Sequence, residues 1–426
     1  MRTLNVESRH MMCDRRICSL ALLFFTSIVS VGRAAPIALE LVEVTKIWDE
    51  APHNAFTDLV RWRDSLYCAF REGRGHVSTD GRIRVLRSTD ARQWTSVHVA
   101  RLDGFDLRDA HLSVTPDDRL MLIGGAAPRK TDHERAPTGS FVAFSRDGTE
   151  WTTPQIVMEP GRWLWCVTWH KGKAYGVSYT AGGGERYLSL HTSTDGLDYD
   201  TLVPRLFDEG YPNETPLRFD RYGTCYALAR RDGSGATPRS AMLGVSRGDY
   251  TQWQWHDLGA EFNSFGGPNF IQLPTGYWIA AGRMHAGGAH TAITLLNVID
   301  HKMTKLLKLP SGGDTSYPGL LWHKDRLWMS YYSSHEGKTS IYLAELKVTY
   351  PCPSCGAAMK TVPMLVGLPT KTMQEQMRRG NALLAGCVGN LHNPVFACVC
   401  AKCRKWKTAE MKHWQDLPKE FGTTVP

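Results

Sequence analysis

Two short strands joined by a tight turn are predicted by the stretch Tyr211-Pro-Asn-Glu-Thr-Pro-Leu-Arg-Phe-Asp-Arg-Tyr-Gly-Thr-Cys-Tyr-Ala-Leu-Ala-Arg-Arg-Asp232. Glu214 opens the first strand, and Arg230 and Arg231 close the second. Because a hairpin returns its end beside its start, this carboxylate and these guanidinium groups are expected at one rim. In an isolated hairpin they would form only a surface salt bridge. The pattern gains weight because the same hairpin recurs along the chain.

Hairpins of this kind fill the sequence from about residue 45 to 348, with start points 48 to 57 residues apart. Besides the Glu214 hairpin, the copies are Asn54–Arg71, Asp109–Gly124, Cys166–Ser178, Asn269–Arg283 and Tyr317–Tyr331. A repeat period near 50, with four strands in each unit, is typical of a β-propeller. The sequence therefore predicts an all-β fold, a six-bladed β-propeller over residues 35–349.

A second repeat, Ser-x-Asp-x-x-x-aromatic, lies between these hairpins. It occurs at Ser88–Trp94, Ser145–Trp151 and Ser193–Tyr199, with a looser copy at Ser246–Trp253. The Asp carboxylate is expected to accept backbone N–H groups in the turn, while the aromatic ring packs between sheets. We therefore interpret this row of carboxylates as structural.

The propeller geometry predicts one central pocket, because the innermost strand of every blade starts at the same face. Those starts supply Asn54, Asp58, Asp109, His111, Glu214, Asn269, Asp314 and Tyr317, and the second strands return Arg71, Arg230, Arg231 and Arg283. Carboxylates, a tyrosine and several arginines around one pocket indicate a site for an acidic substrate.

The Ser-x-Asp turns look like Asp-boxes, and residues 45–348 resemble the sialidase (neuraminidase) superfamily of six-bladed propellers. The resemblance implies an exo-glycosidase that hydrolyses terminal acidic sugars, sialic acid or similar. It implies that Tyr317 is the nucleophile, that Glu214 is its partner and that Asp80 is the acid/base. Arg230 or Arg231, together with Arg283, matches the arginines that bind the substrate carboxylate.

The chemistry accounts for these residue types. The anomeric carbon of a sialoside carries a carboxylate, which repels an anionic nucleophile. A neutral phenol that Glu214 deprotonates during attack avoids this repulsion. Arginines bind the substrate carboxylate in a bidentate manner, and Asp80 would protonate the leaving oxygen and then activate water. The alternative interpretations are structural: Tyr317 would be a packed strand residue, and Asp80 would belong to an ordinary turn.

One departure from the family concerns its first carboxylate-binding arginine, since His53-Asn54 stands at that position. Arg71 and Arg108 are candidates to replace it, although neither occupies the matching place. Two other functions therefore stay open: a hydrolase or lyase for another acidic, uronate-containing glycan, and a non-catalytic carbohydrate-binding propeller. Trp163, together with its neighbours Trp165 and Trp169, is either a sugar-stacking wall or part of the blade core.

The composition agrees with many short strands. The chain has 426 residues, of which 42% are hydrophobic, enough for a large core, and it contains 14 Trp, 15 Tyr and 39 Gly. Such a content of aromatic residues and glycine favours strands and turns over helix bundles. The net charge of +8 comes without a Lys/Arg block, so nucleic acid is not an expected partner.

The N-terminus predicts export. Arg15-Arg16 precede an apolar run, Ile17–Val31, and small residues follow at Ala34-Ala35. This order is typical of a secretory signal peptide, with cleavage expected after Ala34. An uncleaved anchor is the alternative, although the run is shorter than the ~20 residues of a membrane span. We expect a secreted or periplasmic monomer with no membrane contact after cleavage.

Residues 350–426 have a different composition, with six of the eleven cysteines of the chain. Cys352-x-x-Cys355 and Cys400-x-x-Cys403 are two knuckle-like pairs that suit one tetrahedral zinc. A helix is expected at Thr372–Gly380 between them. The tail resembles a zinc-ribbon domain, with disulfides as the rival interpretation in an oxidising compartment and Cys387 and Cys398 as an additional pair. No cofactor is expected for catalysis.

Overall fold

The computed structural model describes residues 36–129, 137–365, 370–384, 395–411 and 413–422. The predicted signal peptide, residues 1–34, and Cys387 lie outside these ranges. Within them, no helix has both the length and the apolar character needed to cross a membrane.

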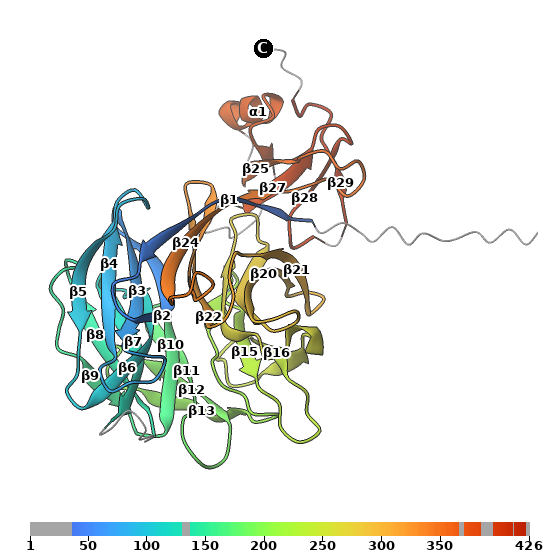
Figure 1. The fold of residues 1–426 in the computed structure, drawn as a ribbon. Helices are drawn as coiled ribbons and strands as arrows, with labels where there is room; N and C mark the ends of the chain where they lie inside the picture. Colours follow the sequence, from blue (N-terminus) through green and yellow to red (C-terminus); the bar gives the residue numbers. More distant parts are fainter. Residues whose placement is uncertain (1–35, 130–136, 366–369, 385–394, 412, 423–426) are drawn as a thin grey trace, which may run out of the picture. The chain divides into compact units, whose positions relative to one another are not determined.

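Six antiparallel sheets of four strands each form the part of the described chain between residues 38 and 349 (Figure 1). In five of them, four consecutive strands pair in chain order. These five sheets are β2 (His53–Trp62), β3 (Ser65–Gly73), β4 (Arg82–Ser88) and β5 (Thr95–Ala100); β6 (Phe105–Val114), β7 (Leu120–Pro128), β8 (Gly139–Ser145) and β9 (Gln155–Met158); β10 (Arg162–His170), β11 (Lys173–Thr180), β12 (Leu188–Ser193) and β13 (Asp200–Phe207); β14 (Leu217–Phe219), β15 (Cys225–Arg231), β16 (Ser240–Ser246) and β17 (Gln254–Asp257); and β18 (Gly266–Gln272), β19 (Trp278–Met284), β20 (His290–Asn297) and β21 (Lys302–Lys308). A short 3₁₀ helix, η1 (Ala260–Phe262), lies between the last two of these sheets in sequence.

The sixth sheet joins the two ends of this region. It contains β22 (Thr315–His323), β23 (Arg326–Ser333) and β24 (Ser340–Thr349), and its outer strand is β1 (Ala38–Trp48). β1 pairs antiparallel with β24 from Ala38 opposite Thr349 to Trp48 opposite Ile341. Because strands from both ends of this region share one sheet, the ring of sheets is closed, as expected of a β-propeller.

The first strand of most sheets carries a bulge near its start. The pairing with the second strand slips between Ala55 and Asp58, Arg108 and His111, Leu164 and Val167, Gly266 and Asn269, and Ser316 and Gly319. At these bulges Phe56, Asp109 and Tyr317 have left-handed φ angles of 62°, 44° and 51°. Such angles are unfavourable for residues other than glycine. A bulge redirects a side chain, so three sheets redirect one side chain each at an equivalent position.

The Ser-x-Asp turns have the hydrogen bonds that the sequence predicts. Asp90 Oδ1 accepts the N–H groups of Arg92 and Gln93 at 2.8 and 2.9 Å. Asp147 does the same for Thr149 and Glu150, and Asp195 for Leu197 and Asp198. In the looser fourth copy, Asp249 accepts only the N–H of Thr251 and the hydroxyl of that residue. These carboxylates are used within their turns, which supports a structural role.

The hydrophobic core lies between neighbouring sheets. One cluster, for example, packs Leu228 and Leu243 of the fourth sheet against Phe270, Trp278 and Ala292 of the fifth. Because side chains alternate along a strand, each sheet presents apolar residues to the neighbours on both of its faces. The starts of the first strands are thereby held in fixed positions.

The tail has its own five-stranded sheet, in the order β26-β25-β27-β28-β29. Its elements are β25 (Lys360–Leu365), α1 (Lys371–Arg378), β26 (Leu383–Leu384), β27 (Val395–Cys400), β28 (Lys405–Lys407) and β29 (Gln415–Asp416). The helix lies within two residues of the predicted range, and its N-cap hydroxyl, from Thr370, accepts the N–H of Met373 at 3.2 Å. Val362, Leu383, Ala397 and Val399 belong to a separate small core.

Candidate active site

A cavity of about 340 Å³ is lined by residues near the starts of several first strands. Its lining residues come from segments far apart in the sequence: Phe56, His76, Val77, Arg108, Asp109, Arg129, Thr138, Trp163, Tyr179, Glu214 and Tyr317. Phe56, Asp109 and Tyr317 are the three bulge residues with left-handed φ angles. The bulges therefore build one shared site.

Tyr317 and Glu214 form the central pair of this cavity. The Tyr317 hydroxyl donates to Glu214 Oε1 at 2.5 Å. Arg230 Nη1 donates to the same carboxylate oxygen at 2.8 Å and to the Tyr317 hydroxyl at 3.3 Å. The second carboxylate oxygen accepts the backbone N–H of Gly267 at 2.6 Å. The sequence prediction that Tyr317, Glu214 and Arg230 meet at one rim agrees with this geometry.

Tyr317 is held as a neutral phenol. Burial raises its pKa well above the ordinary value, and the neighbouring Glu214 charge raises it further, while Arg230 and Arg283 oppose the shift. The phenol can therefore act as a nucleophile only if a base takes its proton during attack. Glu214 Oε1 is already in position to do so.

Arg283 flanks the same tyrosine from another sheet. Its guanidinium carbon lies 5.3 Å from the centre of the Tyr317 ring. Its Nε donates to the carbonyl of Thr315 at 2.9 Å, and Nη2 lies 3.4 Å from the Tyr332 hydroxyl. Two predicted arginines, Arg230 and Arg283, thus stand beside the nucleophile candidate.

Arg231 does not line the cavity, contrary to the sequence prediction. Its side chain is only 4% exposed and forms an ion pair with Asp257 on the outer strand of its own sheet. It also donates to Ser240 Oγ at 2.6 Å. Because successive side chains of a strand point to opposite faces, Arg230 and Arg231 cannot both face the same site.

Arg71 is also engaged in the interior. Its guanidinium is fully buried, with Nε 2.7 Å from Asp106 Oδ1, Nη2 2.9 Å from Ser78 Oγ and Nη1 2.8 Å from the carbonyl of Gly75. A guanidinium with these partners holds its loop rather than a substrate. The prediction that Arg71 binds substrate is therefore not supported.

Asn54, Asp58 and Asn269 hold the backbone around the cavity rather than line it. Asn54 is bonded to the carbonyls of Ala51 and Thr339. Asp58 accepts the N–H groups of Leu59 and Leu112. Asn269 donates to the carbonyl of Pro318 and accepts from Arg218. Asp58 and Asn269 line instead a much smaller void of about 20 Å³, which also includes His111.

Asp80, the predicted acid/base, is not among the cavity-lining residues. Its side chain is 44% exposed and lies 3.6 Å from Arg74 Nε. It also accepts the backbone N–H of Arg74 at 3.1 Å. Although burial opposes the shift, hydrogen bonds from Ser78 and Arg74 lower its pKa. The structure supports the alternative interpretation of Asp80 as a turn residue.

Arg108 and Asp109, both predicted substrate-binding residues, do line the cavity. Arg108 Nη1 donates to the carbonyl of His76 at 3.0 Å, and its Nε lies 3.8 Å from Asp109 Oδ2. Burial raises the pKa of Asp109 to about 6, with Arg108 opposing and Glu214 adding to the shift. Asp109 Oδ1 is buried without a hydrogen-bond partner among the described residues.

Other lining residues include one sequence candidate, Trp163, and two residues that the sequence did not indicate, Tyr179 and Arg129. Trp163, one of the sugar-stacking candidates, is stacked on Tyr179 with ring centroids 5.7 Å apart and planes at 19°. Tyr179 carries no sequence signal of its own. Arg129 directly follows β7 and so ends the second strand of its hairpin, as Arg283 nearly does in its own. The predicted hairpin was ended too early, at Gly124, to include it.

His53, His76 and Asp314 occupy the region where the resemblance predicted a first carboxylate-binding arginine. His53 Nε2 and His76 Nδ1 lie 2.9 and 2.7 Å from Asp314 Oδ2, and Tyr332 donates to Oδ1 at 2.8 Å. These donors outweigh the effect of burial and hold the pKa of Asp314 far below its usual value. The three ligand atoms are close enough for a metal. However, His53 Nδ1 has no partner among the residues that the structure describes, whereas a metal-bound histidine ordinarily donates its second N–H.

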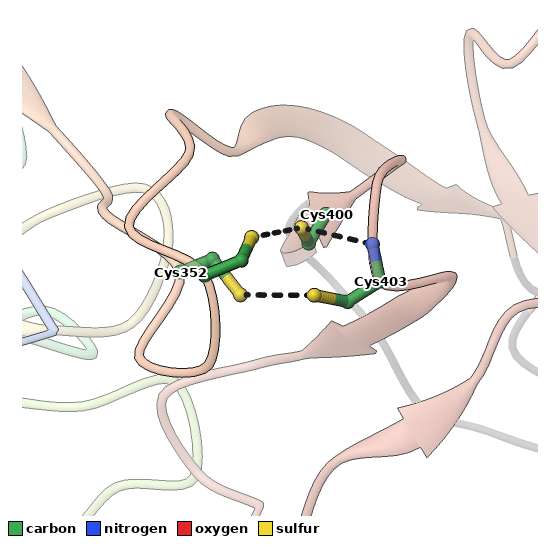
Figure 2. Close-up of side chains that lie close together, drawn as sticks. Cys352, Cys400 and Cys403 are labelled. Carbon is green, nitrogen blue, oxygen red and sulfur yellow. Dashed lines mark hydrogen bonds between the residues drawn. The ribbon is translucent and has the colours of Figure 1, made fainter.

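The four knuckle cysteines of the tail converge, as Figure 2 shows for the labelled three. Their sulfurs all lie within 4.8 Å of one another. The Cys352 and Cys403 sulfurs are 3.9 Å apart, and those of Cys355 and Cys400 are 3.7 Å apart. A disulfide would need about 2.05 Å, whereas four thiolates about 2.3 Å from a tetrahedral zinc lie about 3.8 Å apart. The donor set and its spacing fit zinc.

No protein-family model and no curated protein matches the chain. Among solved structures, it is similar to a protein of unknown function from Dyadobacter fermentans, with TM-score 0.63 and 18% identity over 73% of this chain and 99% of that one. It is also similar to a GH93 α-L-arabinofuranosidase from Fusarium graminearum (TM-score 0.57, 14% identity, 72% and 97% coverage). A Trypanosoma rangeli sialidase is similar too (TM-score 0.55, 11% identity, 69% and 55% coverage). At these identities the likeness shows the fold, a sialidase-like β-propeller, and not the function.

Proposed function

We propose that this protein is a glycoside hydrolase that removes a terminal acidic sugar, sialic acid or a similar one, from a glycan. The observation that carries the proposal is the 2.5 Å hydrogen bond from Tyr317 to Glu214 beside Arg230, inside a cavity of about 340 Å³. The solved glycosidases that share the fold add support. The six sheets would be the six blades, and the Ser-x-Asp turns would be Asp-boxes.

The reaction proceeds in two steps. In the first, the Tyr317 oxygen attacks the anomeric carbon while its proton passes to Glu214 Oε1, and the bond to the leaving oxygen breaks. A second acidic group gives that oxygen its proton. In the next step, water replaces Tyr317 at the anomeric carbon, and Glu214 returns the proton to the phenolate. Because Tyr317 is neutral in the resting site, an anionic sugar can approach it.

An acidic substrate is favoured by the cations at the site. Arg108 and Arg129 line the cavity, and Arg230 and Arg283 flank Tyr317. Guanidinium groups bind carboxylates through paired hydrogen bonds. The second candidate is a uronate-containing glycan, which the His53–Asp314 pair favours because it stands where a sialidase is expected to have an arginine.

Turnover of fluorogenic glycosides tests the proposal. The panel contains a sialoside, a uronoside and a neutral arabinofuranoside, each measured with the wild type and Tyr317→Phe. We expect hydrolysis of one acidic glycoside and a loss of about 10³-fold or more in the variant. Binding of acidic sugars without any turnover by the wild type would instead support the carbohydrate-binding propeller.

We also propose that Cys352, Cys355, Cys400 and Cys403 hold one structural zinc in the tail. Four thiolates complete a tetrahedral shell and leave no open position, so this zinc would stabilise the tail and take no part in catalysis. Metal analysis of the purified chain is expected to find one zinc per chain, lost in Cys400→Ser. Oxidised cysteines without metal would support disulfides instead.

The mature chain would be an exported monomer without its first 34 residues.

A further inference from the structure

The cavity contains a second carboxylate that the Tyr317/Glu214 pair does not use. We propose that Asp109, rather than Asp80, is the general acid and base of this site. The inference rests on the proposed glycosidase function. It assigns to the cavity the proton donor that the leaving oxygen requires.

The position of Asp109 is the first support. Asp109 and Glu214 are the two carboxylates among the cavity-lining residues, and Tyr317 lines the same cavity. Asp80 is absent from that lining and is paired with Arg74 at the surface. A general acid must reach the leaving oxygen, and only a group inside the cavity can do so.

The free oxygen of Asp109 is the second support. Asp109 Oδ1 is buried and lacks a hydrogen-bond partner in the described chain. Other carboxylates nearby are occupied: Asp106 is bound to Arg71 at 2.7 Å, and Asp314 to two histidines and Tyr332. An orphaned buried oxygen is costly unless a ligand or solvent satisfies it. A glycosidic oxygen would be its partner.

The backbone explains why Asp109 faces the cavity. It sits at the bulge between Arg108 and His111, with a left-handed φ of 44°. The neighbouring strand accommodates this bulge through Gly124, where a Cβ atom would lie 2.4 Å from the Arg108 carbonyl oxygen and 3.2 Å from that of Asp109. Strained backbone that the surrounding structure maintains is often a functional feature.

The protonation state suits both halves of the reaction. Burial raises the pKa of Asp109 to about 6, even though the Arg108 charge opposes it. The other charged or titratable groups that act on this carboxyl include Glu214, His111, His76, Arg71, Tyr179 and Tyr317. Near pH 6 the acid form is available to give a proton, and the carboxylate is available to take one back.

Asp109 both gives and regains the proton that the leaving oxygen requires. When the glycosidic bond breaks, the Asp109 proton moves to the leaving oxygen and the product alcohol departs, leaving the carboxylate. That carboxylate then takes a proton from the water that attacks the anomeric carbon and displaces Tyr317. The net reaction consumes one water and restores Asp109 to its acid form.

The test uses Asp109→Asn with Asp80→Asn as the matched control, both in the full chain. Each is assayed on an activated 4-methylumbelliferyl glycoside and on the methyl glycoside of the same sugar, whose leaving group needs protonation. For Asp109→Asn we expect the rate on the methyl glycoside to fall 10²-fold or more. With the activated glycoside, the rate at which the sugar–Tyr317 intermediate forms should fall clearly less. Added azide should partly restore the turnover of the activated glycoside. Asp80→Asn should stay within about threefold of wild type on both.

Three outcomes overturn the inference. Asp109→Asn could lose activity equally on both substrates without azide recovery, or Asp80→Asn could show the leaving-group dependence instead. A wild type that hydrolyses no glycoside of the panel would remove the proposed function itself, and this inference with it. Melting temperatures of both variants separate a chemical defect from unfolding.

Discussion

Gly267→Ala tests the tyrosine site without touching any of its functional groups. A Cβ atom on residue 267 would lie 2.5 Å from Cγ of Tyr317 and 2.9 Å from its Cα. Carbon atoms in contact are normally about 3.5–4.0 Å apart, so Tyr317 must move by about 1 Å. The same residue donates its N–H to Glu214 Oε2 at 2.6 Å, so the glutamate would move as well.

A displacement of about 1 Å in a reacting group can cost about 10²-fold in rate. We therefore expect kcat of Gly267→Ala, measured on the activated glycoside, to fall about 10²-fold. The left-handed φ of 59° at this residue adds a destabilisation of about 1–2 kcal/mol for alanine. That part of the effect concerns folding and must be separated from the loss in rate.

Gly287→Ala is the matched control for this strain. Gly287 also has a left-handed φ, 77°, but a Cβ atom there would meet nothing within 4 Å. In chemical denaturation both variants should therefore lose the stability that the left-handed φ costs, and Gly267→Ala should lose a further amount from its contact with Tyr317, while only Gly267→Ala loses kcat. If Gly267→Ala keeps kcat within about threefold of the control, the close packing of Tyr317 against residue 267 is not needed for activity, and the reasoning is refuted.

Three further predictions concern stability and binding. The pKa of Asp109 is raised from 3.8 to about 6, so the folded chain holds this proton more tightly than the unfolded chain. The proton therefore contributes about 3 kcal/mol to the free energy of unfolding at low pH, and this contribution is lost as pH rises from about 4 through 6. Asp109→Asn should flatten this part of the stability–pH profile obtained by urea denaturation, and an unchanged profile would contradict the assignment. Arg71→Ala should reduce the free energy of unfolding by about 3–5 kcal/mol, because Asp106 loses its nearest buried counter-charge; a loss below 1 kcal/mol would contradict this account. Trp163→Ala should raise KM more than it lowers kcat, because the ring stacked on Tyr179 offers a surface to the sugar; the opposite pattern in steady-state kinetics would argue for a core role.

The repeated hairpins made much of the architecture predictable from sequence. Each copy has the composition of two short strands joined by a turn, so the pairing of first and second strands follows from local pattern alone. The placement of Tyr317 and Glu214 in one pocket follows from the strand starts, whereas their pairing as nucleophile and partner was implied by the family resemblance. The outer strand of the sixth sheet did not follow, since β1 pairs with β24 about 300 residues away in sequence. Local patterns contain no information about such a partner.

The choice between neighbouring residues was also beyond the sequence. Arg230 and Arg231 are adjacent on β15, and strand alternation requires that they point to opposite faces. Which of them faces Tyr317 depends on the register of the strand, and the two residue types do not fix that register. Arg230 contacts Tyr317, whereas Arg231 pairs with Asp257. From charge and spacing alone, both arginines were predicted to bind the substrate.

The acid/base prediction selected a loop residue, Asp80, because it came from the family resemblance, and the bulge at Asp109 gave the sequence no competing signal. A regular strand would place Asp109 by simple alternation, but the slip between Arg108 and His111 adds an unpaired residue and rotates the side chain. The slip lies beside Gly124 on the next strand, where a Cβ atom would meet the Arg108 carbonyl oxygen, and a glycine alone does not mark such a slip in the sequence. A glycine also permits close packing at Tyr317, which Gly267 contacts from a different sheet. Chemistry at this site therefore depends on residues with no functional group, which is why substitutions of glycine are as informative here as substitutions of the carboxylates.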